Sequence, residues 1–325
     1  MTSLADQLRT RIAADGPIGV DDFMAAANTH YYATRDPLGP GGDFVTAPEI
    51  SQMFGEIVGA ALADVWVRAG RPTDAIYVEL GPGRGTLAAD ALRVMRRVGF
   101  AGATHFVETS PALRAAQARA VPEALFHASI DTLPAAPILL VANEFFDALP
   151  VRQWAGREVR RIAYDSARFV FTGDGEIRED SPARSEAAVA LGHHLAGHGG
   201  AALVIDYGYA DGEQGDTLQA VRAHAFADPL ADPGEQDLTT HVDFAALAAA
   251  LRSEGVTVSR PVSQGSWLET LGIGARAATL AATNPDQTEA VAAARRRLCD
   301  DDEMGRLFKV VAFTAVNWPP VAGLE

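Results

Sequence analysis

Three glycines at alternate positions follow a short apolar run that ends in an acid. The run and the turn lie in AIYVELGPGRGTLAADALR, residues 75–93, where the acid is Glu79. The glycines are Gly81, Gly83 and Gly85. A glycine-rich turn between a strand and a helix lets a ligand approach the backbone closely. The dinucleotide fingerprint has its third glycine one position later, where this chain has Thr86, so the spacing disfavours NAD.

A second acid, Glu108, ends the next apolar segment, HFVETS. Its carboxylate can accept hydrogen bonds from two vicinal hydroxyls at once, as a ribose would require. An acid, the G-x-G-x-G turn and a second strand that ends in an acid together resemble the class I S-adenosylmethionine-dependent methyltransferases. The alternative is an ordinary tight turn followed by a solvated strand end.

This resemblance implies which residues surround S-adenosylmethionine. The glycine turn, with Glu79, packs against the methionine part, and Glu108 holds the ribose hydroxyls. In HASIDTLP, after the third strand, Ser129 and Ile130 are expected near the adenine, where an apolar side chain can stack and a polar one can reach an edge. Asn143, at the end of the fourth strand, completes the predicted cofactor-binding set.

Two further acids follow the fourth strand, in LLVANEFFDALPV. Open α/β sheets bind ligands at the carboxyl ends of their strands, so we expect chemistry there. Glu144 and Asp147 are three residues apart, and on a helical turn they would share a face and could grip one cationic group. The alternative is a helix that begins with acids near its positive end. Asp206 and Tyr207 end another parallel strand and could complete the pocket wall.

The composition excludes several classes of function. With 27 Lys and Arg against 42 Asp and Glu, the net charge of −15 argues against a nucleic-acid scaffold, because phosphate contacts need clustered cations. No apolar run reaches the roughly 18 residues of a membrane span, so no membrane partner is expected. The one cysteine, Cys299, cannot form an internal disulfide, and the N-terminus has no apolar signal region, which predicts a cytoplasmic location.

The histidines of LGHHLAGHGG could be considered as metal ligands. His193, His194 and His198 include an i, i+4 pair with the spacing of a zinc site. No carboxylate or thiol stands near them in sequence, and the surrounding glycines indicate a fraying helix end. The sequence therefore predicts no metal site.

The elements that must position these residues alternate between strand and helix. Strands are expected at AIYVEL, THFVETS, ALFHA, PILLVAN and AALVIDYGY, with helices at 86–98 and 111–120 between the first of them. This alternation is typical of a parallel, doubly wound α/β sheet. From Val151 to Asp180 polar and apolar residues alternate between glycine turns, which predicts antiparallel hairpins inserted into the sheet.

The rest of the chain adds helices at both ends. Two short helices and a Gly/Pro-rich loop lead to a helix at about 50–69, and a helical stretch to about residue 297 precedes a closing strand. The predicted organisation has three parts. They are a helical segment with a cofactor-capping loop at 1–70, a methyltransferase core at 71–150 and 199–325, and an inserted substrate region at 151–198.

Long motifs along the chain resemble those of one family. They are GPIGVDDFM, HYYATRDPLGPGGDFVTAPEISQMFGE, VELGPGRGTL, NEFFDALPV and QAVRAHAFADPLADPGEQDLTTHVDF. Over residues 10–316 the chain is similar to the MidA-like family, which includes the mitochondrial complex I assembly-factor arginine methyltransferase and many bacterial members. The resemblance implies a class I methyltransferase core, a family-specific N-terminal segment and N-methylation of a protein arginine.

One position departs from the family pattern. His30 stands where a glycine is expected before the paired Tyr31 and Tyr32, which bears on how these rings pack over the cofactor. No mitochondrial presequence precedes the family region, so a bacterial, cytoplasmic member is expected.

A guanidinium acceptor requires acids in the site. Its pKa is about 13.8, so it is protonated at neutral pH, and its delocalised charge leaves each nitrogen a poor nucleophile. Carboxylates can localise that charge, and the candidates are Glu144, Asp147 and Glu49 of TAPEI. The acidic chain agrees in sign with a cationic protein substrate. Two alternatives stay open, namely a non-catalytic assembly or interaction protein and a small-molecule or lipid methyltransferase on the same core.

Overall fold

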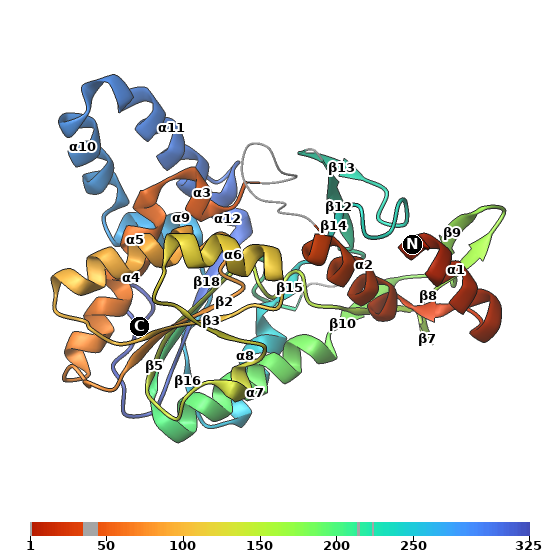
Figure 1. Ribbon diagram of the computed structural model, residues 1–325, viewed down its shortest axis with the longest axis horizontal. Helices are drawn as coiled ribbons and strands as arrows, with labels where there is room; N and C mark the ends of the chain where they lie inside the picture. The colour runs from red at the N-terminus through yellow and green to blue at the C-terminus, as the bar shows by residue number, and fades with distance from the viewer. Residues whose placement is uncertain (1, 35–44, 213–214, 223) are drawn as a thin grey trace.

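The computed structural model describes residues 2–34, 45–212, 215–222 and 224–325 (Figure 1). Nine strands of these described residues form a central sheet whose main order is β16-β18-β11-β5-β2-β3-β4. In chain order they are β2 Ile76–Leu80, β3 Thr104–Val107, β4 Leu125–His127, β5 Ile138–Asn143, β11 Gly200–Tyr209, β15 Val242–Asp243, β16 Thr257–Val258, β17 Val262–Ser263 and β18 Phe308–Thr314. The short β15 and β17 pair with β11 and β18.

The inner strands are buried on both faces, which is why their sequences read as continuous apolar runs. Every residue of β2 and of β5 is buried. β2 pairs in parallel with β3 and β5, and β5 pairs in parallel with β11. The neighbour beyond β11 is β18, which runs antiparallel to it. The predicted, mostly parallel sheet is confirmed.

Helices cover both faces of this sheet. One face carries α4 and α5, and the other carries α7 and α8. Their bounds are α4 Gln52–Arg68, α5 Thr86–Arg97, α7 Pro182–His198 and α8 Phe244–Ser253. Successive side chains of a strand point to opposite faces, so Tyr77 belongs to the first core and Val78 to the second.

The N-terminal helices and the inserted hairpins share a third hydrophobic core. Phe23 and Met24 of α2 pack with Val151 and Ile162 of the insertion, and β1 pairs antiparallel with β8. The elements are α1 Leu4–Asp15, β1 Ile18–Gly19, α2 Val20–Thr34, β6 Arg152–Ala155, β7 Glu158–Val159, β8 Arg161–Asp165, β9 Arg168–Phe171 and β10 Ile177–Asp180. Figure 1 shows α1 and α2 beside β8 and β9 at one end of the molecule.

This packing joins two parts of the predicted division, which stays a prediction. Apolar side chains from 1–70 and from 151–198 form one cluster. Within 151–198 only the hairpins join that cluster, because α7 packs on the sheet through Ala188, Leu191 and Leu195. Much of the expected capping loop, residues 35–44, lies outside the described residues.

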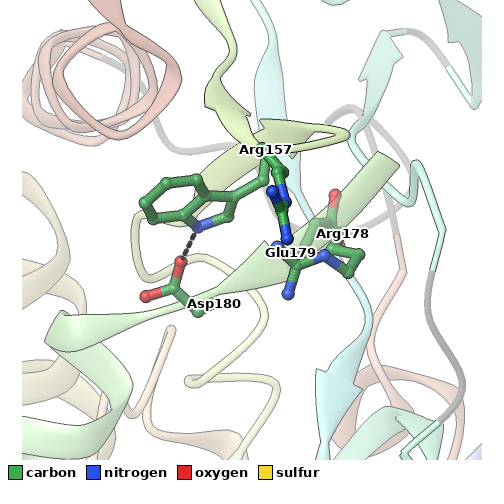
Figure 2. A pocket seen from close by; sticks show the side chains of 5 residues that line it. Arg157, Arg178, Glu179 and Asp180 are labelled. Carbon is green, nitrogen blue, oxygen red and sulfur yellow. Dashed lines mark hydrogen bonds between the residues drawn. The ribbon is translucent and has the colours of Figure 1, made fainter. Parts of the chain in front are cut away.

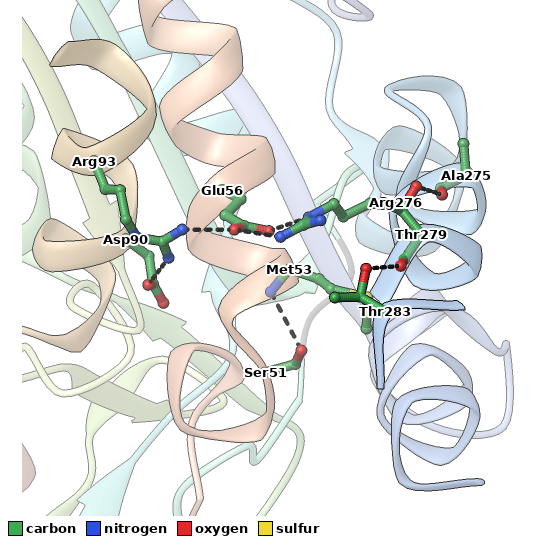
Figure 3. Close-up of polar contacts among 9 residues, drawn as sticks. All are labelled: Ser51, Met53, Glu56, Asp90, Arg93, Ala275, Arg276, Thr279 and Thr283. Atoms are coloured by element: carbon green, nitrogen blue, oxygen red, sulfur yellow. Dashed lines mark hydrogen bonds and ion pairs between the residues drawn. The ribbon is translucent and has the colours of Figure 1, made fainter. Parts of the chain in front are cut away.

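Near the C-terminus, α10 and α11 form a pair that extends from the sheet (Figure 1). The predicted helical stretch is in fact α9 Gln264–Thr270, α10 Ile273–Thr283 and α11 Thr288–Cys299, followed by α12 Met304–Leu307. Figure 3 shows how α10 is tied to the core: the Glu56 carboxylate of α4 accepts Arg276 Nε at 2.6 Å and Arg93 Nη1 of α5 at 2.8 Å. Burial opposes ionisation of Glu56, but these two guanidinium groups hold its pKa below the ordinary value.

The remaining elements are short. They are α3 Ala47–Ile50, α6 Pro111–Ala120, β12 Gln219–Arg222, β13 Ala225–Ala227, β14 Asp237–Thr239 and two 3₁₀ turns, η1 Ile130–Thr132 and η2 Pro285–Gln287. In the part of the chain that the structure describes, no helix combines the length and apolar character needed to cross a bilayer.

Candidate functional site

The carboxyl ends of β2, β3, β5 and β11 meet at one edge of the sheet, called here the ligand edge. Parallel pairing brings them together, and β2 lies between β3 and β5. The glycine turn and Glu108 therefore face the segment after β5 across a short distance in the fold. This is the place where open α/β sheets bind their ligands.

The glycine turn has backbone angles that favour glycine. The φ angles of Gly81, Gly83 and Gly85 are 57°, 55° and 83°. A Cβ at Gly81 would lie 3.1 Å from Cδ2 of Phe145, and one at Gly85 would lie 3.2 Å from Cβ of Ala120. The turn is thus left-handed and closely packed, and it exposes backbone to a ligand where larger residues would block it.

Glu79 lies at the start of this turn and is buried, with 3% of its surface exposed. The Tyr77 hydroxyl donates to its carboxylate at 2.8 Å. Burial raises the pKa of Glu79 to about 8, so the group is largely a neutral acid at pH 7.

Glu108, after β3, is already surrounded by donors. Its Oε1 accepts the backbone N–H groups of Thr109 at 2.8 Å and Ser110 at 2.7 Å. Its Oε2 accepts Nε2 of Gln117 at 3.0 Å. The carboxylate is therefore held in one orientation at the edge where the ribose is predicted.

The predicted adenine contacts lie beyond β4. Ile130 is 7% exposed and belongs to the hydrophobic core on the α7 face. Ser129 precedes η1, and its carbonyl accepts the Thr132 hydroxyl at 2.9 Å. The structure places the pair one strand away from Glu108, since β3 and β4 are neighbours.

Asn143 and Glu144 form the end of β5 and share a hydrogen bond. Nδ2 of Asn143 donates to Oε1 of Glu144 at 3.1 Å, and the N–H of Ala47 donates to the same oxygen at 3.3 Å. Glu144 has φ 51°, an uncommon value for a residue with a side chain. Burial, and then the nearby Asp147 carboxyl, raise the pKa of Glu144 to about 8.

Asp147 lies in a turn, and the predicted helical turn is not formed there. Oδ2 of Asp206 in β11 accepts the N–H groups of Phe146 at 3.0 Å and Asp147 at 3.2 Å and so holds the turn against the neighbouring strand. Asp147 is 5% exposed, and its Oδ1 has no hydrogen-bond partner in the described part of the chain. Burial raises its pKa, although a hydrogen bond from Tyr207 opposes the shift.

Arg184 of α7, which the sequence did not single out, holds this turn in place. Its guanidinium donates to the carbonyls of Phe146, Asp147, Thr240 and His241 and to the Thr240 hydroxyl. The side chain is buried, and burial lowers its pKa. Its bonds go to carbonyls, so Arg184 fixes the backbone beside the acids.

The contact between Asp237 and Tyr32 was also not predicted from the sequence. The Tyr32 hydroxyl donates to Oδ1 of Asp237 at 2.8 Å, and the Tyr32 carbonyl accepts the Ser110 hydroxyl at 2.7 Å. Asp237 lies near enough to Glu144 to contribute to its raised pKa. The one available signal was QDLTTHVDF, part of a long motif whose acids carried no assigned role.

Glu49 of α3 is brought to the glycine turn. Its Oε1 accepts the Thr86 hydroxyl at 2.5 Å, and its Oε2 lies 4.0 Å from Nη1 of Arg84. Within the described residues it makes no hydrogen bond with Glu144 or Asp147. The same short helix reaches Glu144 through the N–H of Ala47, so α3 spans the two sides of the ligand edge.

Two other features lie outside this edge. A surface hollow of about 490 Å³ on the inserted hairpins is lined by Trp154, Arg157, Arg178, Glu179 and Asp180. Figure 2 shows Asp180 accepting a hydrogen bond there, and the donor is Nε1 of Trp154. Among the histidines considered above, Nε2 of His194 is 3.0 Å from the Ala136 carbonyl.

The residues present fit an S-adenosylmethionine molecule. Oδ1 of Asn143 is a buried acceptor without a partner in the described chain, and it lies at the ligand edge. The cofactor carries an ammonium group, an exocyclic amine and two ribose hydroxyls, all of which are donors. The left-handed glycine turn supplies the close backbone surface that a bound nucleoside needs.

Comparison with known proteins agrees with this geometry. The family model described as "Putative S-adenosyl-L-methionine-dependent methyltransferase" matches residues 57–168 and 158–262. The chain is 35% identical over 369 residues to "Protein arginine methyltransferase NDUFAF7 homolog, mitochondrial" of Drosophila melanogaster, covering 95% of this chain and 84% of that protein. It is 32% identical to the NDUFAF7 protein of Homo sapiens, covering 85% and 75%.

A solved structure is similar over almost the whole chain. A Burkholderia thailandensis protein, crystallised with S-adenosyl-homocysteine, superposes with a TM-score of 0.84 at 27% identity, covering 98% of this chain and 93% of that one. The MidA-like resemblance, the fold class and S-adenosylmethionine as cofactor are thereby confirmed. The chain belongs to the family of S-adenosylmethionine-dependent methyltransferases that includes the NDUFAF7 proteins.

Proposed function

We propose that this methyltransferase N-methylates an arginine of a protein substrate. The observation that carries the proposal is a pair of acids, Glu144 and Asp147, beside the cofactor edge, with Oδ1 of Asp147 buried and without a hydrogen-bond partner in the described part of the chain. Burial raises the pKa of both acids, and although the charge of Arg184 opposes the shift of Asp147, the hydrogen bonds of Arg184 go to carbonyls and a hydroxyl. A guanidinium would supply both the positive charge and the donors. The names of the NDUFAF7 relatives support the same acceptor.

The chemistry requires the acceptor nitrogen to lose a proton as it gains the methyl group. When bound, S-adenosylmethionine supplies an electrophilic methyl group on a sulfonium. Glu144 is the proposed proton acceptor, because a pKa of about 8 is close to working pH, as a general base requires. Asp147 localises the remaining guanidinium charge on the nitrogens that do not react. Arg184 keeps the backbone of Phe146 and Asp147 in place.

The cofactor-side residues are assigned in the same proposal. Gly81, Gly83 and Gly85 with Glu79 hold the methionine part, Glu108 holds the ribose, Ser129 and Ile130 contact the adenine, and Asn143 contacts the cofactor from β5. Glu49 was expected among the acceptor acids. Its bond to Thr86 supports a place near the start of α5, so its acceptor role ranks below that of Glu144 and Asp147.

The proposed substrate is a protein with a cationic target, which agrees with the net charge of −15. A bacterial, cytoplasmic setting is also part of the proposal. The similar solved structure comes from Burkholderia thailandensis, and the one cysteine is consistent with a reducing compartment.

The test is a proteome comparison by mass spectrometry. Cells that lack the protein are complemented with wild type, with Glu144→Gln or with Glu158→Gln, the last being an exposed acid on β7. We expect a 14-dalton or 28-dalton mark on arginine that wild type and Glu158→Gln restore and Glu144→Gln does not. Methylation of a metabolite or lipid without any arginine mark would instead establish the small-molecule alternative.

A further inference from the structure

Gln117 of α6 connects the glycine turn with Glu108, the two parts of the predicted cofactor site that are called here the cradle. It is fully buried, and its Nε2 donates to the Gly83 carbonyl at 2.8 Å and to Oε2 of Glu108 at 3.0 Å. The first partner lies in the glycine turn and the second at the end of β3. No role was assigned to this residue from the sequence.

Helix α6 packs closely against the cradle. A Cβ at Gly85 would be 3.5 Å from Cα of Gln117. One turn earlier, Arg114 donates from Nε to the backbone carbonyl of Glu108 at 2.7 Å. The helix thus fixes both the backbone and the carboxylate of Glu108, and Gln117 is the residue that reaches the carboxylate.

The carboxylate of Glu108 has about four acceptor positions. The N–H groups of Thr109 and Ser110 occupy two on Oε1, and Gln117 occupies one on Oε2. Oε2 is the oxygen with a position left for a ligand. Among the described residues, Gln117 is the one hydrogen-bond partner of Oε2, so the orientation of the oxygen offered to a ribose hydroxyl depends on Gln117.

We propose that Gln117 is a positioning residue for the cofactor, which locks Glu108 to the glycine turn before the cofactor binds. The inference rests on the proposed ribose contact of Glu108. A side chain fixed in advance does not have to be ordered on binding, and that ordering would cost conformational entropy. Losing a hydrogen bond to a charged group costs more.

The first experiment measures S-adenosylhomocysteine affinity by calorimetry for Gln117→Met, which keeps the length and removes the amide. We expect the dissociation constant to rise about tenfold or more. The matched control is Gln264→Met. Gln264 is equally buried, also has an unpartnered Oε1, and donates to the Leu298 carbonyl away from the cradle. Its change should leave the affinity within about twofold of wild type.

A double-mutant cycle separates this inference from the role of Glu108. Glu108→Ala should weaken binding about thirtyfold, and adding Gln117→Met should weaken it less than about threefold further, because Gln117 acts through Glu108. If Glu108→Ala has no effect, the ribose assignment fails, and this inference fails with it. If both changes weaken binding and their effects multiply, the ribose assignment stands and the inference is wrong.

If Gln117→Met does not fold, the variant Gln117→Glu tests the same proposal. At pH 8 its carboxylate would face that of Glu108, whereas at pH 6 the pair can share a proton and restore a donor. Relative to wild type at each pH, we expect weak binding at pH 8 and recovery of several-fold or more at pH 6. A pH-independent loss, or no loss, would overturn the proposal, since a role in packing alone would not follow the shared proton.

Discussion

Two acids at the ligand edge, Glu108 on the cofactor side and Glu144 on the acceptor side, lie in different surroundings. On the cofactor side, Glu108 accepts three hydrogen bonds from residues within nine positions of it, all in the same β3–α6 unit. On the acceptor side, Glu144, Asp147 and Asp206 are buried close together, and burial raises the pKa of each. One side holds a carboxylate ready for neutral hydroxyls. The other holds acids that a cation would ionise.

This difference in surroundings indicates which ligand each side suits. A ribose brings no charge, so a carboxylate that nearby N–H donors already hold in one orientation suits it. A guanidinium brings a full charge, so it suits acids whose pKa burial has raised, because it stabilises their charged forms. Substitutions on the cofactor side, where the contacts are local in sequence, should lower cofactor affinity. Substitutions on the acceptor side, where the contacts join distant residues, should lower turnover.

The largest expected effect is on the cofactor side. Gly83→Val places a branched side chain at φ 55° in the turn, so S-adenosylhomocysteine affinity should fall about a thousandfold through strain and blocked approach. Calorimetry measures it, with Gly156→Val as control, since Gly156 has φ 61° in open space on the hairpins. Unchanged affinity in a folded Gly83→Val protein would remove the glycine turn from the cofactor side.

The acceptor side should respond to Glu144→Gln with a fall in turnover of about a hundredfold, the scale for losing one electrostatic contributor. Cofactor affinity should stay near wild type, because the cofactor's proposed partners are untouched. Methyl transfer to the cell's cationic protein fraction and cofactor titration are measured on one preparation, with Glu158→Gln alongside. If activity survives, or if affinity falls in step, the role passes to Asp147 or Glu49.

The pH dependence sharpens the contrast further. The pKa of Glu144 is about 8, raised by burial and then by Asp147, so its ionised form increases as pH rises toward 8. With cofactor saturating, kcat/KM for the acceptor should rise about fiftyfold from pH 6 to pH 8 and then level off. The pKa of Glu79 on the cofactor side is also about 8, so cofactor affinity is measured separately over the same range. A flat profile in wild type, or the same rise in Glu144→Gln, would show that Glu144 does not titrate in the reaction.

The smallest effect tests the contact between the two sides. Tyr32→Phe removes the hydroxyl that donates to Asp237 but keeps the carbonyl that binds Ser110. The acceptor KM should rise about tenfold while cofactor affinity holds within twofold. Tyr164→Phe is the control, because its hydroxyl bonds Arg9 between α1 and β8. Loss of cofactor affinity in Tyr32→Phe would place Tyr32 on the cofactor side.

Much of the cofactor side could be predicted because it is local. Helix 111–120 and the strand before it were expected almost as they are observed. The apolar runs marked the buried parallel strands, and the glycine spacing marked the turn. Gln117 was missed even so, since its partners become neighbours only when α6 packs against the turn.

The acceptor side could be predicted only in part. The acids after β5 were identified from their position at a strand end, but the helical turn expected for them was wrong. Asp206, 60 residues from Phe146, accepts backbone N–H groups of this segment, and the spacing of nearby residues did not predict that contact. Glu49 was expected with these acids because carboxylates can localise the charge of a guanidinium. The spacing of residues along the chain did not predict its hydrogen bond with Thr86.

By itself, the sequence determined the class of sheet, the glycine turn, the acids at strand ends and the resemblance to the methyltransferase family. These depend on local spacing and on burial of whole strands, which leave a pattern in consecutive residues. The tertiary structure alone decided that Tyr32 meets Asp237 across 205 residues and that Arg184 holds the turn after β5. Such contacts form only when separate elements pack together. The sequence around a polar residue does not indicate its distant partner, because the need for a hydrogen bond arises only when the residue is buried.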